Sequence, residues 1–183
     1  MTGASQGGAF TIAGAALDSR LNAIAPAIQF MGDFPNYFKV GEWPRYQALQ
    51  QQTALGLSDD ELYAFLSYFD TKNLATLVTC PVTTCMGLQD PVCPIRTNFA
   101  PYNVFTSTDK HYVVNDNCKH ETPAEWYNTY ITFFNEHLKS ASVVDAIAKE
   151  AEADAPRYNV LGIRVGDDYK GIVISNGKKF VQK

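Results

Sequence analysis

Gly3-Ala4-Ser5-Gln6-Gly7-Gly8 stands near the start of the chain, and the small apolar residues 9–17 follow it. The stretch predicts a sharp turn that leads into a tightly packed helix ending near Asp18. A G-x-S-x-G pattern of this kind holds its serine in a strained turn, where the hydroxyl is exposed and larger neighbouring side chains would clash. The pattern is weak by itself, because Gly-rich turns with a central serine also occur without any chemistry. Ser5 is therefore a candidate nucleophile that needs partners from elsewhere in the chain.

Strand and helix patterns alternate after this turn. We expect an apolar strand at 21–30, helices within 37–69, a strand at 77–86 ended by Gly87, a helix at about 96–105, a strand at 111–114 and an amphipathic helix at about 123–138. Ser58-Asp59-Asp60-Glu61 is a capping box that begins one of the helices. Strands that alternate with helices of about a dozen residues indicate an α/β fold, in which a mostly parallel sheet is covered on both faces. The helical stretch 37–69 is interpreted as an insertion over the sheet.

Composition sets limits on the class of protein. A chain of 183 residues that is 46% hydrophobic is sufficient for one buried core. Because 15 basic residues face 19 acidic ones without a basic stripe, we expect no nucleic-acid partner. The apolar runs are far shorter than the roughly 20 residues of a membrane helix, so we expect no membrane span. Met1 precedes a Gly-rich segment rather than a basic and then apolar leader, so no signal peptide is expected in this chain.

The four cysteines, Cys80, Cys85, Cys93 and Cys118, show no C-x-x-C spacing and no histidine at zinc-finger distance. A structural metal is therefore not expected, and nothing in the sequence calls for a cofactor. Cys80 and Cys85 are separated by an odd number of positions, so on one strand they would point to opposite faces and could not form a disulfide. We predict buried thiols rather than disulfides.

Asp90 and His120 provide the partners that a nucleophilic serine needs. Each follows the end of a predicted strand, and parallel strands bring their carboxyl ends to one edge of a sheet. The order serine, acid, histidine is the one that this type of fold uses. We therefore predict that His120 is the base, that Asp90 orients it, and that the N–H of Gln6 at the helix N-terminus stabilises an oxyanion.

Simpler interpretations compete with these roles. Asp90 could be only a turn former before a proline, and His120 only a surface residue at a helix start. His111, in or beside a strand, and His137, near a helix C-terminus where a cation suits the dipole, both have structural explanations. Asp116 is the reserve candidate for the acid.

The C-terminal part of the chain differs in character from residues 1–139. Residues 140–157 are rich in Ala, Asp, Glu and Ser and are predicted to be a linker. Residues 158–183 alternate apolar and polar positions, and Asn176-Gly177 is a two-residue hairpin signal. We predict a small β-meander, whose short length gives it little stability by itself.

Several motifs of residues 3–138 resemble the acetyl xylan esterase and cephalosporin-C deacetylase family of carbohydrate esterases, within the α/β-hydrolase superfamily. These are Gly3-Ala-Ser-Gln-Gly-Gly8, Asp33-Phe-Pro35, Leu66-Ser-Tyr-Phe-Asp70, Gly87-Leu-Gln-Asp-Pro-Val-Cys-Pro94 and His120-Glu121. The resemblance implies the C-terminal portion of an α/β-hydrolase fold, followed by the small β tail. It further implies that Ser5 attacks an acetyl ester of xylan, another acetylated oligosaccharide or a small ester, with His120, Asp90 and Gln6 in the roles given above and no metal.

The chain departs from the family pattern in two ways. Ile95-Arg96-Thr97 and Lys119 stand where the family usually has Pro-Ser-Thr and glycine. More seriously, the family's strands before the nucleophile, including the one that leads into Ser5, and the loop that gives a second oxyanion N–H are expected to be missing. We therefore expect a fragment or an internally started reading frame, which associates with itself or with the missing N-terminal half. A non-catalytic remnant and a serine peptidase of the prolyl-oligopeptidase type stay open as alternatives.

The tail resembles the short C-terminal sorting-type domain of type IX secretion in Gram-negative bacteria. The resemblance rests on Tyr158-Asn-Val-Leu-Gly-Ile-Arg-Val165, Lys170-Gly-Ile-Val-Ile174 and Asn176-Gly-Lys-Lys179. It implies that the parent protein is secreted or held at the cell surface.

Overall fold

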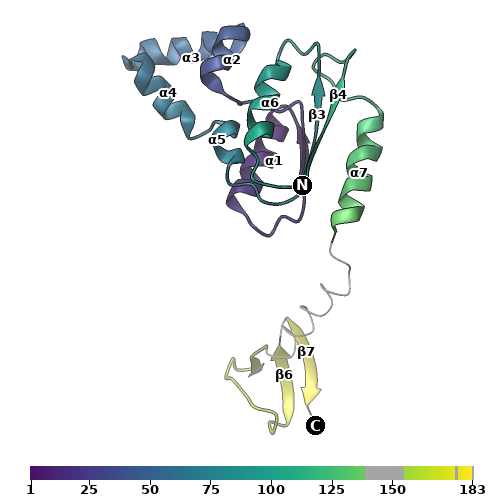
Figure 1. Cartoon of the computed structure of the whole chain (residues 1–183). Coiled ribbons are helices and arrows are strands. Elements are labelled where there is room, and N and C mark those ends of the chain that lie inside the picture. Colours follow the sequence, from purple (N-terminus) through teal and green to yellow (C-terminus); the bar gives the residue numbers. More distant parts are fainter. Residues whose placement is uncertain (139–154, 176, 183) are drawn as a thin grey trace. The chain divides into compact units, whose positions relative to one another are not determined.

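The computed structural model describes residues 1–138, 155–175 and 177–182 (Figure 1). The chain divides into two compact units, Met1–Leu138 and Lys139–Lys183. The predicted catalytic domain, 1–139, meets the predicted linker next to this division, and most of the linker lies outside the described residues. Each unit is described separately below.

A four-stranded parallel sheet forms the centre of the first unit. Its strands are β1 (Thr2–Ala4), β2 (Ala25–Ala27), β3 (Val82–Gly87) and β4 (Lys110–Asn115), and they lie in this order. Every neighbouring pair is parallel. The predicted α/β class with a parallel sheet is confirmed. The expectation that no strand leads into Ser5 was wrong, because β1 pairs with β2 immediately before that residue.

Two strands are shorter than the sequence predicts. Of the predicted strand 21–30, Ala25–Ala27 forms β2 and Ile24 adds an isolated bridge to Val82. Ile28 turns the backbone to φ 39° and ends the strand. Residues 77–81 of the other prediction lie outside β3: the chain leaves α5 through a turn, in which the N–H of Val78 donates to the carbonyl of Ala75, and continues without regular structure to Pro81. Val78 is fully buried, so its apolar character serves the core and not a strand.

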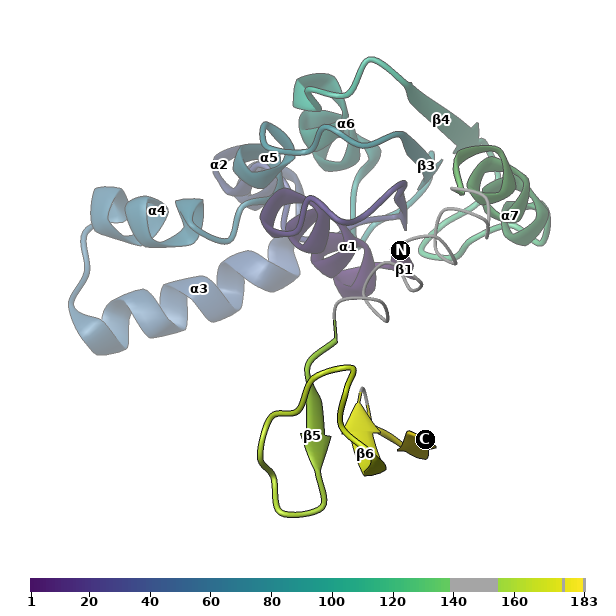
Figure 2. The ribbon, with the colours of Figure 1, turned by 90° about the horizontal axis from the view of Figure 1, so that it is seen from below.

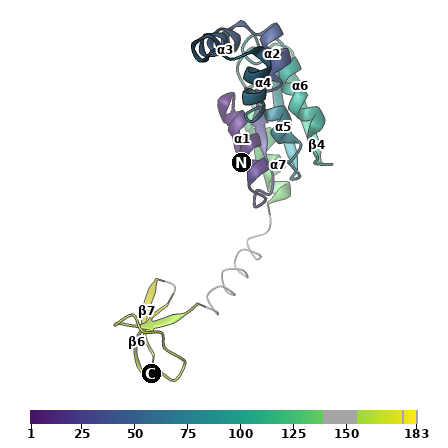
Figure 3. The same cartoon turned by 90° about the vertical axis from the view of Figure 1, so that its left-hand side faces the viewer.

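Helices cover both faces of the sheet (Figure 1). On one face, α1 (Gln6–Leu17) packs through Ile12 against Ile24 and Val82, together with α5 (Thr71–Ala75). Next to α5 lies α6 (Ile95–Val104), as Figure 3 shows. These apolar side chains are fully buried, and such burial is the main favourable contribution to folding.

The opposite face of the sheet is covered by α7 (Glu125–His137). Its Trp126 packs against Ala25, Ala27 and Cys85. Because Cys85 and Val82 are separated by an odd number of positions on β3, they face opposite sides of the sheet. A continuous run of buried residues along β3 is the pattern expected for a strand covered on both faces.

Three helices inserted between β2 and β3 form a small cluster with its own core. They are α2 (Phe34–Val40), α3 (Glu42–Leu55) and α4 (Asp59–Ser67). The predicted capping box of Ser58 and Glu61 begins α4. Phe34, Tyr37 and Leu62 are buried together among these helices. The prediction of an insertion over the sheet was wrong: α3 and α4 extend outward from it, and Figure 2 shows them beyond α1 and α5.

The second unit holds a three-stranded antiparallel sheet. Its strands are β5 (Arg157–Asn159), β6 (Gly171–Ser175) and β7 (Lys178–Gln182), in the order β5-β6-β7. Ser175 pairs with Lys178, so the hairpin has the two-residue loop that the sequence predicts. Gly177 has φ 71°, a conformation that glycine adopts easily, while Asn176 lies outside the described residues.

No helix in the described part of the chain has both the length and the apolar character needed to cross a bilayer.

Candidate active site

Ser5 occupies a sharp turn between β1 and α1. Its backbone has φ 55° and ψ −119°, which is unusual for a residue with a side chain. The N–H of Ser5 donates to the carbonyl of Ala27 at 3.0 Å, and its own carbonyl accepts from the N–H of Phe30 at 3.0 Å. The predicted strained turn is confirmed, and the end of β2 holds it in place.

Two of the three glycines around Ser5 are needed for close packing. A Cβ on Gly3 would lie 2.5 Å from the carbonyl oxygen of Gly7, and a Cβ on Gly8 would lie 2.8 Å from that of Ala27. Gly7 is different, since a Cβ there would meet nothing within 4 Å. The predicted clash with larger side chains therefore accounts for glycine at positions 3 and 8. It does not account for Gly7, where a side chain would meet open space.

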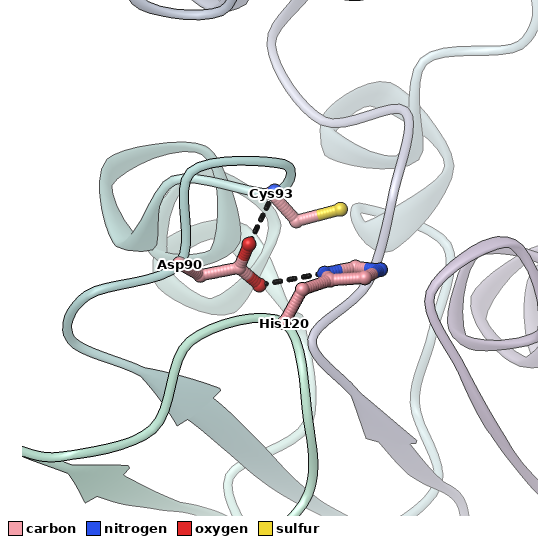
Figure 4. A group of neighbouring side chains, drawn as sticks. All are labelled: Asp90, Cys93 and His120. Carbon is pink, nitrogen blue, oxygen red and sulfur yellow. Dashed lines mark hydrogen bonds and ion pairs between the residues drawn. The ribbon is translucent and has the colours of Figure 1, made fainter.

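Asp90 is held by the backbone of its own loop, just after β3. Its Oδ1 accepts hydrogen bonds from the N–H groups of Val92 and Cys93, both at 2.8 Å. Its Oδ2 lies 2.9 Å from Nδ1 of His120 (Figure 4). The carboxylate side chain is fully buried. Asp90 thus forms a turn, as the simpler interpretation proposed, and contacts His120 at the same time.

His120 joins the other two residues. Its Nε2 lies 3.0 Å from Oγ of Ser5, while its Nδ1 faces Asp90. The side chain is 28% exposed, so it stands between the buried carboxylate and solvent. The structure therefore brings Ser5, His120 and Asp90 into one continuous row of hydrogen bonds, although 115 positions separate the first two in sequence.

Gly87, the last residue of β3, allows the loop that carries His120 to approach closely. A Cβ on Gly87 would lie 2.3 Å from the carbonyl oxygen of Lys119 and 2.8 Å from that of Cys118. The N–H of Gln89 also donates to the carbonyl of Cys118 at 3.1 Å. The loops of Asp90 and His120 are therefore packed against each other through the backbone.

The other candidates lie elsewhere. Nε2 of His111 and Nε2 of His137 each lie 2.8 Å from Asp109, one on each carboxylate oxygen. Nδ1 of His137 also lies 2.7 Å from the carbonyl oxygen of Phe133 in α7. Asp116 contributes its backbone carbonyl to the side chain of Gln89. The two histidines thus bind Asp109 and the end of α7, and Asp116 does not contact His120 through any hydrogen bond of the described residues.

The arrangement has the geometry for proton transfer from a hydroxyl. With Nδ1 donating to the carboxylate of Asp90, Nε2 of His120 is free to accept the hydroxyl proton of Ser5. An imidazolium formed in this way would be stabilised by the adjacent carboxylate. Gln6 begins α1, and N–H groups in the first turn of a helix have no acceptor within the helix. The positive end of the helix therefore lies beside Ser5, where negative charge would develop.

Cys93 lies beside the site, although it was not among the predicted site residues. It is 1% exposed, and its thiol interacts with Ser5 and Tyr37. Burial, followed by the negative charge of Asp90, raises the pKa of this thiol to about 12. The Asp-x-x-Cys turn could have indicated it, because an aspartate often accepts from N–H groups two and three positions later. All four cysteines are free thiols; Cys85 and Cys93 are buried as predicted, whereas Cys80 and Cys118 are only partly buried.

Tyr37 and Asp70 support the site from the helical insertion. The buried hydroxyl of Tyr37 donates to the carbonyl of Val92 in the Asp90 loop, and burial raises its pKa. The carboxylate of Asp70 accepts from the N–H groups of Asp33 and Phe34, at 2.8 and 2.9 Å, and so holds the start of α2. Sequence patterns gave these residues no role, since both contacts join segments more than 30 positions apart.

A cavity of about 420 Å³ opens beside the turn. Gln6 contributes to its lining, and most of the rest is apolar and comes from the segment 30–66. Its aromatic members include Phe30, Phe34, Phe38 and Phe65. A mostly apolar cavity next to a few convergent polar groups is the usual form of a small-molecule site.

Comparisons with known proteins identify the family to which the first unit is similar. Residues 1–138 match the family model of acetyl xylan esterase (AXE1). A curated relative, the acetyl esterase Axe7A of Xylanibacter ruminicola, is 28% identical over 139 residues, which are 75% of this chain and 30% of that protein.

Two solved structures give the same result. The acetyl xylan esterase 1 of Thermoanaerobacterium sp. JW/SL YS485 is 31% identical with a TM-score of 0.65, over 75% of this chain and 45% of that one. The acetyl xylan esterase of Paenibacillus sp. R4 is 27% identical with a TM-score of 0.64, over 74% and 44%. The chain thus spans under half the length of each relative. Since the family model covers the whole unit that holds the site, the chain belongs to the acetyl xylan esterase family.

Proposed function

We propose that this chain carries the part of an acetyl-ester hydrolase that holds its nucleophile, base and acid. The observation that carries the proposal is the row of hydrogen bonds in which His120 lies 3.0 Å from Ser5 and 2.9 Å from Asp90. Membership of the acetyl xylan esterase family supports an ester as the substrate.

In the proposed reaction, Oγ of Ser5 attacks the carbonyl carbon of the acetyl group while its proton passes to Nε2 of His120. The oxyanion that forms is stabilised by the N–H of Gln6. His120 then returns the proton to the leaving sugar oxygen, and the acetyl group stays on Ser5. Water repeats the sequence in the second half, which releases acetate and restores the hydroxyl. Asp90 keeps the imidazole in the tautomer that can accept the proton.

The proposed substrate is an acetylated oligosaccharide, such as a fragment of xylan, or a small acetyl ester. Two relatives are named acetyl xylan esterases and a third is named an acetyl esterase, which supports this class. The apolar cavity beside Gln6 would receive the less polar part of such an ester. Parallel assays with acetyl esters and peptides separate this proposal from a peptidase of similar fold.

The second candidate is a chain that is inactive by itself and that associates with another chain. The specific observation behind it is that β1 pairs with β2 alone within the described sheet. An open strand edge invites pairing with another chain. A second copy of the chain, or the N-terminal half of a longer relative, would cover this edge. Without a second oxyanion donor, the rate would be lower by a factor of about 100 to 1,000.

The tail keeps its proposed role as a sorting-type domain, which would make the parent protein secreted or surface-bound. Its described residues form a three-stranded sheet, and none of them takes part in the proposed chemistry.

The central experiment is an assay of the purified chain and its Ser5→Ala variant on a chromogenic acetate. A serine-reactive phosphonate, followed by mass spectrometry, should label Ser5 in the wild type and leave Ser5→Ala unlabelled. We expect Ser5→Ala to lower the rate to the level of buffer. Equal rates for the two proteins would eliminate the proposed nucleophile, and absence of both hydrolysis and labelling would favour the second candidate.

A further inference from the structure

Cys93 places a thiol beside the Asp90–His120 pair, and the proposed reaction makes no use of it. One carboxylate oxygen of Asp90, Sγ of Cys93 and one ring nitrogen of His120 all lie within 4.8 Å of one another (Figure 4). We propose that these three side chains form a binding site for a soft divalent cation, of the class of Zn²⁺ or Cd²⁺, and that the bound ion inhibits ester hydrolysis.

The distances are close to those that a shared ion requires. Zinc binds sulfur at about 2.3 Å and nitrogen or oxygen at about 2.0–2.2 Å in a tetrahedron, so its ligand atoms lie roughly 3–4 Å apart. The oxygen Oδ2 of Asp90 and Nδ1 of His120 are 2.9 Å apart. Because the three ligand atoms lie within 4.8 Å of one another, rotation of the Cys93 and His120 side chains would be needed to bring them to these distances. Because Nδ1 is the ring nitrogen that faces Asp90, it is the one that a shared ion would take.

The charges in the site favour a divalent ion. Asp90 supplies one negative charge, and Cys93 supplies a second when the ion displaces its proton. The two charges balance those of the cation, which matters because Cys93 and Asp90 are buried. A thiolate and an imidazole select zinc, cadmium and similar ions, whereas magnesium and calcium prefer oxygen ligands.

An ion at Nδ1 would exclude the proposed catalysis. The remaining ring proton would then lie on Nε2, which faces Oγ of Ser5 at 3.0 Å. In that tautomer Nε2 is a donor and cannot accept the proton of the hydroxyl. The inhibition rests on the proposed function, but binding of the ion does not.

Binding is tested first, on the full chain and without any ester. Titration with CdCl₂ is followed by the ultraviolet charge-transfer absorption of a cadmium–thiolate bond. We expect one equivalent to bind to the wild type and to Cys80→Ser, a matched control at a thiol that packs against a separate core cluster. Cys93→Ser should weaken binding at least about 100-fold, since even outer-shell changes cost 10–100-fold. Equal affinity in Cys93→Ser, or loss of the signal in Cys80→Ser, would overturn the site.

A second variant keeps this test decisive if Cys93→Ser does not fold. His120→Gln changes a partly exposed side chain, and circular dichroism checks its fold. It should retain the thiol yet bind Cd²⁺ at least about 100-fold more weakly. Unchanged affinity in His120→Gln would show cysteine binding alone and contradict the three-residue site.

Inhibition is tested separately with ZnCl₂ in the acetate assay. We expect ZnCl₂ to abolish the activity reversibly, so that EDTA restores it, and we expect MgCl₂ to have no such effect. Cys80→Ser should be inhibited like the wild type, and Cys93→Ser at a zinc concentration at least about 100-fold higher. Equal inhibition of the wild type and Cys93→Ser would overturn the inhibitory role. If the chain hydrolyses no ester, the proposed function fails, and the cadmium titration still decides whether the ion binds.

Discussion

The loop that carries Asp90 and the loop that carries His120 are built differently, although they meet at one point. Asp90 is fully buried, and two backbone N–H groups hold its carboxylate. His120 is partly exposed, and its ring is held by Asp90 and Ser5 themselves. The acid is therefore fixed by the fold, whereas the base is positioned by its two partners and by the packing of its loop against Gly87. In the proposed reaction the histidine accepts and returns a proton, and a less constrained position suits that role.

Asp90→Asn should give the largest effect. The remaining oxygen of the amide can still accept from Val92 and Cys93, so the loop should keep its shape. The amide nitrogen would face Nδ1 of His120 and favour the tautomer in which Nε2 cannot accept the serine proton. We expect kcat on a chromogenic acetate to fall about 10,000-fold. Denaturant unfolding should confirm that the variant folds, and a loss of less than about tenfold would show that the charge of Asp90 has no role.

Gly87→Ala tests the packing of the base loop. Its methyl group would meet the carbonyl oxygens of Lys119 and Cys118, both backbone atoms that can move only with the loop. We expect the free energy of unfolding to fall by about 1–3 kcal/mol. We also expect activity to fall about 100-fold, because His120 would shift relative to Ser5. Gly7→Ala is the matched control for stability: with open space at its Cβ, it should leave the unfolding free energy unchanged or raise it.

Tyr37→Phe tests the support of the acid loop and should give a smaller effect. The variant loses the hydrogen bond to the carbonyl of Val92 and leaves that carbonyl without this donor. We expect a loss of about 1–2 kcal/mol in unfolding free energy and less than about tenfold in kcat/KM. If Tyr37→Phe lost more activity than Gly87→Ala, the loop of Asp90 would be more easily disturbed than the loop of His120, which is the opposite of the difference described above.

The smallest effect is expected at the His137–Asp109 pair, which lies outside the site. The carbonyl of Phe133, followed by Asp109, raises the pKa of His137, and the bond to His137 lowers the pKa of Asp109. The histidine contribution to stability is full below its ordinary pKa of 6.5 and is lost as the pH rises through the raised value. The aspartate contribution is full above 3.8 and is lost as the pH falls through the lowered value.

Stability from this pair should therefore be greatest between those two pH values. Because Asp109 is 42% exposed, solvent screening limits the effect to at most about 1 kcal/mol. Urea unfolding at about pH 5 and about pH 9 should show a difference that His137→Gln reduces. An unchanged pH dependence in His137→Gln would mean that the pair contributes nothing measurable.

The sequence was sufficient to predict the fold class and the three residues of the hydrogen-bonded row. Ser5, Asp90 and His120 could be found because parallel strands end at one edge, so a residue just after a strand has a predictable place. The supports of the row could not be found in this way. Tyr37 reaches Val92 and Asp70 reaches Phe34 through contacts that depend on how the inserted helices fold back.

Strand lengths were the weakest part of the prediction. The residues around Val78 have the composition of a strand but lie outside β3, with Val78 buried in the core and Leu77 exposed. At Ile28 a backbone turn ends β2 early, although isoleucine favours strands. Tertiary packing overrides local preference in both places. The three residues of β1 were too few to show any periodicity.

The turns that brace Ser5 have a consequence for engineering. Besides Ser5, the backbone has positive φ at Ile28, Met31 and Asp33, and such residues cost of order 1–3 kcal/mol each in a protein. A search for heat-resistant variants would test positions such as Met31, where glycine relieves the backbone but gives up the packing of the methionine side chain against the helical cluster. Relief of this strain would loosen the segment that fixes Ser5, so variants selected for survival at high temperature alone should lose the geometry on which the proposed hydrolysis depends.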